Sequence, residues 1–242
     1  MKKTGVAVLT YNRPDFCKQT LEYVKKLKNV DCRALHDDGS DKADYTEVFN
    51  TYSKDFHLIK TKENGGVAKA KNRVVKYLLD EGCEYIFLIE DDILVKDEDS
   101  VTKYIDASIK TGIEHLNFHN HGPANKVGAV NIGEVITLWP HCVGAFSFYT
   151  KKCFEVGFFD EHFINAWEHV EHTGRIAKTG LTTPFWYFAD VTGSENLMEE
   201  IPNSIEYSSI RHTPEWTKNM EEGLIYWKQK DGCGLPPKSY AM

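Results

Sequence analysis

Three adjacent acids end an apolar run in the first half of the chain, in the stretch YIFLIEDDILVKDED (85–99). The run YIFLI is apolar enough to form a buried strand, and Glu90, Asp91 and Asp92 follow it directly. Like charges at the edge of a low-dielectric core are costly unless a cation, a ligand or water compensates them. Carboxylate oxygens are good ligands for Mg²⁺ and Mn²⁺. The triplet therefore predicts a site that something outside the chain completes.

Two further polar clusters also follow apolar runs. TYNRP (10–14) comes at the end of GVAVLTY, and DDGSD (37–41) overlaps the end of CRALHDD. In open α/β sheets ligands bind at the carboxyl ends of the strands, so the three clusters are expected to face one crevice. A fourth stretch, NGGVAKAKNR (64–73), opens a helix with two glycines. These allow close backbone approach and leave helix N–H groups for an anion.

The elements that position these clusters alternate along the first half of the chain, as expected for βαβ units. Apolar β-rich runs predict strands at 5–11, 32–38 and 56–61 and a fourth ending on the acids, and helical periodicity predicts helices over 13–29 and 64–82. In the second half, residues 133–150 suggest strands, 153–180 a loop followed by a helix, and 216–232 a terminal amphipathic helix. The pattern predicts an α/β fold with a mostly parallel sheet in one domain.

Composition excludes several classes of protein. The 242 residues are 41% hydrophobic and 27% charged, which is typical of a globular chain, and the net charge of −7 gives no general attraction to a phosphate backbone. No apolar segment is long enough for a signal peptide or a membrane span, so a soluble, cytoplasmic protein is expected. Six scattered cysteines form no CxxC pair and predict free thiols: Cys17, Cys32, Cys83, Cys142, Cys153 and Cys233.

In order and spacing, these motifs resemble the glycosyltransferases with a GT-A fold, especially the large second family of inverting nucleotide-sugar transferases. The resemblance runs from about residue 4 to 180 through VAVLTYNRP, DDGSD, NGGVAKAKNR, FLIEDDI and FDEHFINAWEHVEHTGRIAKTG. It implies a single GT-A (Rossmann-like) domain with a mixed, mostly parallel sheet flanked by helices. Residues 1–95 would be the nucleotide-binding half, 96–212 the acceptor and catalytic half, and 213–242 a C-terminal helical tail.

The resemblance gives the acidic triplet a role. The triplet stands where the family has its DxD-type motif, so Asp92 is expected to bind Mn²⁺ or Mg²⁺, Asp91 to contact the ribose or metal-bound water, and Glu90 to support them. Such a metal bridges the diphosphate and neutralises the charge that grows on the leaving nucleotide. The alternative is a solvated acidic turn at a strand end.

The same resemblance assigns a nucleotide pocket. Asp38 matches the acid that accepts a hydrogen bond from the uracil imide N–H, and Thr10, Tyr11 and Arg13 would line the pocket beside it. Lys71 stands where relatives usually have arginine; it keeps a cation for phosphate or a base oxygen but loses the bidentate fork. Without these neighbours, DDGSD is a plain turn signal, and Pro14 with the polar residues before it is a helix start.

Two later motifs supply the remaining expected site residues. In AWEHVEHTGRI, Glu168 keeps the first acid of the family's ED pair, which supplies the catalytic base, whereas His169 replaces the second. Either side chain could take the proton from the acceptor hydroxyl, and Glu168 is the first choice. In SSIRHTPEW, His212 is the expected further metal ligand, although it could equally belong to a helix boundary before TPEW.

The expected function is therefore a metal-dependent transfer of a hexosyl or pentosyl group from a nucleotide sugar, most simply a UDP-sugar, to an acceptor hydroxyl with inversion. One alternative is a nucleotidyltransferase, but LTYNRPDF lacks the glycine-rich loop of that class. Another is a catalytically silent nucleotide-sugar or glycan-binding module, which three departures from the family pattern keep open: Lys71, His169, and Ile89 where many relatives have the first aspartate. The acceptor remains open between a soluble glycan and a hydroxylated nucleobase in DNA.

Overall fold

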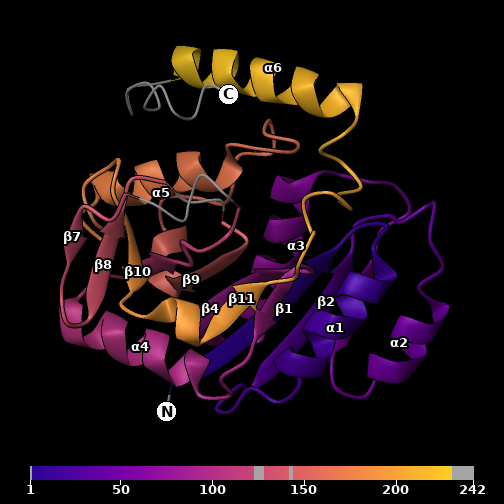
Figure 1. Ribbon diagram of the computed structural model, residues 1–242, viewed down its shortest axis with the longest axis horizontal. Helices are drawn as coiled ribbons and strands as arrows, with labels where there is room; N and C mark the ends of the chain where they lie inside the picture. Colours follow the sequence, from indigo (N-terminus) through magenta and orange to yellow (C-terminus); the bar gives the residue numbers. More distant parts are fainter. Residues whose placement is uncertain (1, 123–127, 142–143, 231–242) are drawn as a thin grey trace.

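Four parallel strands begin a central six-stranded sheet, shown in Figure 1. The computed structural model describes residues 2–122, 128–141 and 144–230. The strand order is β3-β2-β1-β4-β9-β6, and β9 runs antiparallel to both of its neighbours. Two smaller antiparallel sheets, β10-β8-β7 and β11-β5, complete the single domain.

Within these ranges the elements follow one another in chain order. They are β1 (Lys3–Thr10), α1 (Pro14–Val24), β2 (Cys32–Asp37), α2 (Thr46–Tyr52), β3 (His57–Lys60), α3 (Val67–Asp80), β4 (Cys83–Glu90), β5 (Ile93–Val95), α4 (Ser100–Thr111), β6 (His115–Asn117), β7 (Asn131–Ile132), β8 (Ile136–Trp139), β9 (Phe146–Thr150), η2 (Lys151–Phe154), α5 (Glu168–Lys178), β10 (Phe188–Val191), η3 (Ser194–Asn196), β11 (Met198–Glu200) and α6 (Pro214–Lys230).

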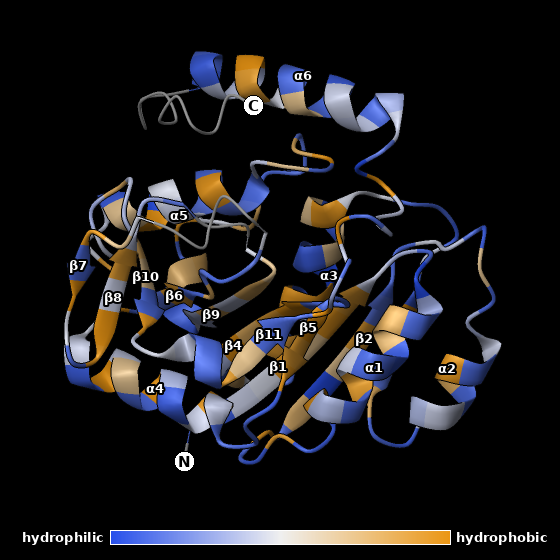
Figure 2. Ribbon diagram, viewed as in Figure 1, coloured by the Kyte–Doolittle hydropathy of each residue, from blue (hydrophilic) through white to orange (hydrophobic). Residues whose placement is uncertain are grey.

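The two faces of the sheet are both covered by helices. Val6 and Val8 of β1 pack in a cluster with α1 and α4, whereas Ala7 and Leu9 point the other way, toward α3 and α5. Burial on both faces explains why the parallel strands read as continuous apolar runs, and Figure 2 shows hydrophobic residues filling them. The predicted mixed, mostly parallel sheet flanked by helices is confirmed.

The first helix is shorter than predicted. The pattern favoured a helix over 13–29, but α1 ends at Val24 and the backbone N–H of Asp31 already bonds to the carbonyl oxygen of Thr4, 2.9 Å away. The chain must turn back within these residues because β2 starts beside the beginning of β1. Tertiary pairing therefore overrides the helix propensity of the lysine-rich segment.

The C-terminal part of the chain returns to the strand ends that carry the polar clusters. β11 pairs with β5, residues 201–213 follow, and α6 lies across the end of the molecule opposite the N-terminus (Figure 1). The indole N–H of Trp167, the residue before α5, donates to the carbonyl oxygen of Met220 at 3.0 Å and so ties α5 to α6. The predicted helix over 216–232 begins at Pro214, two residues early, and residues 231–232 lie outside the described residues.

The described residues bear on two expectations for the whole chain, one about membrane-spanning segments and one about free cysteine thiols. None of the helices in the described ranges is long and apolar enough to cross a membrane. The described cysteines are free, and Cys142 and Cys233 lie outside the described residues; the free thiols are Cys17, Cys32, Cys83 and Cys153.

Candidate functional site

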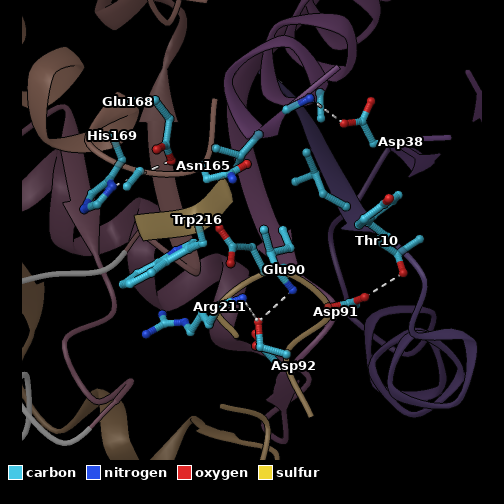
Figure 3. A pocket seen from close by; sticks show the side chains of 18 of the residues that line it. Thr10, Asp38, Glu90, Asp91, Asp92, Asn165, Glu168, His169, Arg211 and Trp216 are labelled. Atoms are coloured by element: carbon cyan, nitrogen blue, oxygen red, sulfur yellow. Dashed lines mark hydrogen bonds and ion pairs between the residues drawn. The ribbon is translucent and has the colours of Figure 1, made fainter. Parts of the chain in front are cut away.

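A cavity of about 340 Å³ lies at the carboxyl ends of β1 and β4 (Figure 3). It brings together most of the residues predicted from the sequence. The predicted residues that line it are Thr10, Tyr11, Arg13, Asp38, Glu90, Asp91, Asp92, Glu168 and His169. Lys71 and His212 do not line it.

The acidic triplet is already paired with a cation of the same chain. The guanidinium of Arg13 donates to a carboxylate oxygen of Asp91, and both its terminal nitrogens lie 3.3 Å from Asp92 Oδ2. Thr10 Oγ1 donates to the other oxygen of Asp91 at 2.6 Å. Burial raises the pKa of Asp91 to about 7 although Arg13 opposes it, whereas at Asp92 the cations outweigh burial and lower the pKa. Asp91 and Asp92 therefore form a buried charged pair and not a solvated turn, while Glu90 beside them is partly exposed.

A histidine that the sequence analysis did not single out completes this cluster. The Nε2 atom of His121 lies 3.6 Å from Asp92 Oδ2 and 3.8 Å from Glu200 Oε1, and the side chain is buried. Burial would lower its pKa, but the two carboxylates raise it overall. The pattern HNH (119–121), one residue after the short strand β6, is a signal that could have marked this residue.

The Asp38 carboxylate lines the cavity and already accepts several hydrogen bonds from the chain. Its Oδ2 accepts the backbone N–H groups of Gly65 and Gly66 at 3.0 and 2.9 Å, and its Oδ1 accepts from Arg73 at 3.0 Å. The anion expected at the start of α3 is thus the Asp38 carboxylate itself. Gly66 has φ +87°, and a Cβ there would lie 2.7 Å from the carbonyl oxygen of Ile164, so the glycine is required for this approach.

Lys71 lies beneath the cavity in a buried ion-pair network. Its Nζ donates to Glu168 Oε1 at 2.8 Å, and Glu90 Oε1 lies 3.4 Å away on the other side. Burial would lower the pKa of Lys71 and raise that of Glu168, but the mutual attraction prevails in both cases. Glu168 is therefore held as a carboxylate. Lys71 does not line the cavity in this arrangement, so its contact to phosphate or base stays a prediction.

His169 has its place because Gly144 lacks a side chain. A Cβ on Gly144, whose φ is +70°, would lie 2.6 Å from Cγ of the His169 ring. The ring Nδ1 is 3.7 Å from Glu168 Oε1, and the His169 carbonyl oxygen accepts a hydrogen bond from Thr173 Oγ1 at 2.7 Å. Glu168 and His169 thus face the cavity together from the first turn of α5, opposite the acids (Figure 3).

The segment before α6 and the first turns of α6 form a further wall of the cavity. Ser209 Oγ donates to the Tyr11 carbonyl oxygen at 3.0 Å, and Arg211 and Trp216 line the cavity. The neighbouring His212 instead bonds through Nε2 to the carbonyl oxygen of Ile205 at 3.0 Å. This segment would have to rearrange before His212 could join Asp92, so its predicted role as a metal ligand stays a prediction.

Comparison with known proteins agrees with this architecture. Residues 5–121 match the family model described as Glycosyl transferase family 2. An uncharacterized glycosyltransferase of Acanthamoeba polyphaga mimivirus is 26% identical over 221 residues, which cover 86% of this chain and 85% of the relative.

Solved structures with the same fold include two glycosyltransferases. The mannosyltransferase PcManGT from Pyrobaculum calidifontis, in complex with GDP-Man and Mn²⁺, matches with a TM-score of 0.56 and 15% identity over 76% of this chain and 55% of its own. Residues 1–349 of S. aureus TarS, in complex with UDP-GlcNAc, match with a TM-score of 0.56 and 17% identity over 72% of this chain and 52% of their own. The chain thus spans about half the length of these structures.

The mixed, mostly parallel sheet with its antiparallel partner strand matches the fold of the GT-A glycosyltransferase structures. The family match over residues 5–121 and the similarity to the mimivirus protein support the assignment of this chain as a family 2 glycosyltransferase.

Proposed function

We propose that the protein transfers a sugar from a nucleotide sugar, most simply a UDP-sugar, to an acceptor hydroxyl with inversion. The observation that carries the proposal is the convergence of Asp38, the acidic triplet and the Glu168–His169 pair on one cavity. A protein that only binds a nucleotide would need Asp38 and the acidic triplet but not the Glu168–His169 pair. A second, ionisable group facing them across the cavity is what a transfer reaction requires.

The donor would lie along the strand ends. Asp38 lines the cavity together with Tyr11 and Asn64, where a uracil imide N–H would find an anionic acceptor. The diphosphate would then extend toward Arg13 and the acids. The complexes of the related folds with UDP-GlcNAc and GDP-Man support a nucleotide-sugar donor and leave the choice of base to experiment.

Two donor atoms for a divalent cation lie at the acids, although the described residues hold no preformed group of three His, Cys, Asp or Glu ligands. Among the described residues, Asp92 Oδ1 is buried and has no hydrogen-bond partner, and His121 lies on the other oxygen of that carboxylate. One carboxylate oxygen and one imidazole nitrogen form a donor set that suits Mn²⁺ better than Mg²⁺. When bound, such an ion would offset the negative charge on the departing diphosphate. Asp92 is the residue we propose to hold it, with Asp91 and Glu90 in support.

His169 is proposed to take the proton from the acceptor hydroxyl, with Glu168 as its partner. The sequence alone made Glu168 the first choice for the catalytic base. In the structure Glu168 is paired with Lys71, and this pairing lowers the basicity of the carboxylate. A carboxylate beside the ring stabilises the imidazolium that forms when His169 accepts the proton. The acceptor oxygen would attack the anomeric carbon from the side opposite the diphosphate, which gives inversion. Trp216 supplies an aromatic ring on which an acceptor sugar could stack.

The test is release of nucleoside diphosphate from UDP-, GDP-, dTDP- and CMP-sugars with Mn²⁺, Mg²⁺ or EDTA. Wild type should turn over one donor with a divalent cation and lose that activity with EDTA. Asp92→Asn should lose it as well, whereas the control Asp99→Asn, an exposed acid after β5, should retain it. The anomeric configuration of the product, read by NMR, tests inversion. Tight donor binding with no turnover in any metal would instead favour the silent binding module.

A further inference from the structure

The guanidinium of Arg13 lies where two buried carboxylates need positive charge. Besides Asp91 and Asp92, it donates through Nη1 to the carbonyl oxygen of Ser204 at 3.4 Å and lies 5.4 Å from the centre of the Phe16 ring. The side chain is 14% exposed, against 2% and 7% for the two acids. The chain thus compensates the acids with a planar cation, which binds carboxylates strongly.

This pairing leaves one oxygen of Asp92 unused. Arg13 and His121 both approach Oδ2, whereas Oδ1 is buried without a hydrogen-bond partner among the described residues. A buried carboxylate oxygen without a partner is costly, so this atom is available for a further ligand. A divalent cation on Oδ1 would, however, share its carboxylate with the Arg13 guanidinium. The two positive charges would repel each other at a distance of a few ångströms in a poorly hydrated site.

We infer that Arg13 is a displaceable counter-cation of the Asp91–Asp92 pair, which a divalent cation must move aside before it can bind Asp92 tightly. A nucleoside diphosphate would favour the exchange because its phosphates offer the guanidinium a new anionic partner. Metal and nucleotide binding should therefore be positively coupled, and Arg13 should carry much of that coupling. The role differs from that of a simple nucleotide contact, since it acts on the metal even when no nucleotide is present.

The inference rests on the proposed metal dependence, and Mn²⁺ binding can test it without any turnover. Free Mn²⁺ is measured by electron paramagnetic resonance in titrations of the full chain with and without UDP. Without UDP, Arg13→Gln should bind Mn²⁺ about tenfold or more tightly than wild type, because the competing charge is gone. UDP should tighten Mn²⁺ binding clearly in wild type and much less in Arg13→Gln. Arg13→Lys, which keeps a point charge without the fork, should fall between them.

Arg211→Gln is the matched control, since Arg211 is a second arginine lining the same cavity and makes no ion pair with the acids among the described residues. It should change Mn²⁺ affinity without UDP by less than about threefold, because its charge is farther from Asp92. Equal or weaker Mn²⁺ binding by Arg13→Gln than by wild type would overturn the inference. If neither protein binds Mn²⁺ under any condition, the proposed metal dependence fails together with it.

Loss of Arg13 also removes the counter-charge of Asp91 and part of that of Asp92, so Arg13→Gln should melt at a lower temperature than wild type in EDTA. Mn²⁺ should raise its melting temperature more than it raises that of wild type, because the ion replaces the missing cation. A variant that is unfolded in EDTA and folds with Mn²⁺ would support the inference. If Mn²⁺ raises the melting temperature of Arg13→Gln no more than that of wild type, the result would contradict the inference.

Discussion

Lys71 Nζ lies 2.8 Å from Glu168 Oε1, and this ion pair joins α3 to the first residue of α5. Both side chains are almost fully buried, and Glu90 at the end of β4 lies on the other side of the amine. The pair fixes the charge state of Glu168 and holds the start of α5 against the sheet. Its removal should therefore affect both stability and catalysis.

Lys71→Gln should destabilise the fold by about 3–5 kcal/mol, the usual cost of leaving a buried charge without its partner. Lys69→Gln, an exposed lysine on the same helix, should change the free energy of unfolding by less than about 0.5 kcal/mol. Urea unfolding at neutral pH measures both. Equal stability of the two variants would mean that the ion pair contributes nothing net.

The same variant should alter the response of stability to acid. Lys71 and His169 lower the pKa of folded Glu168 despite burial, so its charge contributes stability that is present above the unfolded pKa and is lost as pH falls toward the folded one. Wild type should lose stability as pH drops below about 4.3, the pKa of an unfolded glutamate. Lys71→Gln should lose less over that range, because Glu168 no longer gains from being ionised. Parallel pH curves for the two proteins would contradict the assignment.

His169→Gln should lower kcat by about 10²–10⁴-fold, the usual contribution of a general base, with little change in donor binding. Glu168→Gln should lower it less, since it removes the partner and leaves the ring. His162→Gln, an exposed histidine outside the cavity lining, is the control and should behave as wild type. A larger loss with Glu168→Gln than with His169→Gln would return the base to Glu168.

Asp38→Asn should weaken UDP binding and reduce the preference for uridine over cytidine nucleotides by about tenfold, because the amide offers an N–H donor as well as an acceptor. Arg73→Gln separates this effect from loop positioning, since Arg73 bonds to Asp38 but does not line the cavity. Arg73→Gln should keep the wild-type preference for uridine over cytidine nucleotides. Competition binding with UDP and CDP measures both, and an unchanged ratio in Asp38→Asn would exclude its role in base recognition.

Gly144→Ala should reduce kcat at least tenfold, because the new Cβ would occupy the place of the His169 ring. Gly180→Ala is the matched control: Gly180 also has positive φ, +76°, but nothing lies within 4 Å of its Cβ position. Both variants should lose about 1–2 kcal/mol of stability from backbone strain. Only Gly144→Ala should also lose activity. Equal kcat values for Gly144→Ala and Gly180→Ala would show that the His169 ring adapts to the new Cβ.

The sequence allowed the parallel sheet and the convergence of the polar clusters to be predicted because both follow from local patterns. Apolar runs ending in TYNRP, DDGSD and EDD fix where strands stop, and parallel strand ends meet at one edge. The helices α2 and α4 were not assigned. Their positions depend on packing against the sheet as much as on their own periodicity.

The ion pairs within the site could not be predicted from local sequence patterns. Lys71 and Glu168 are separated by 97 residues, and Arg13 and Asp91 by 78, so no local pattern connects them. Lys71 had the appearance of an exposed phosphate contact because lysine is usually solvated. The place of His169 also depends on Gly144, a single residue whose missing side chain has meaning only once α5 is packed beside it.

The walls of the cavity come from distant parts of the sequence, which matters during synthesis. Tyr11 and Arg13 leave the ribosome well before Ser204, Ser209 and Trp216, which close over them and lie 191 or more residues later in the chain. Arg13 and its two acids, by contrast, all lie within the first 92 residues. The nascent chain can therefore neutralise its acidic site long before the segment that encloses a donor has been translated.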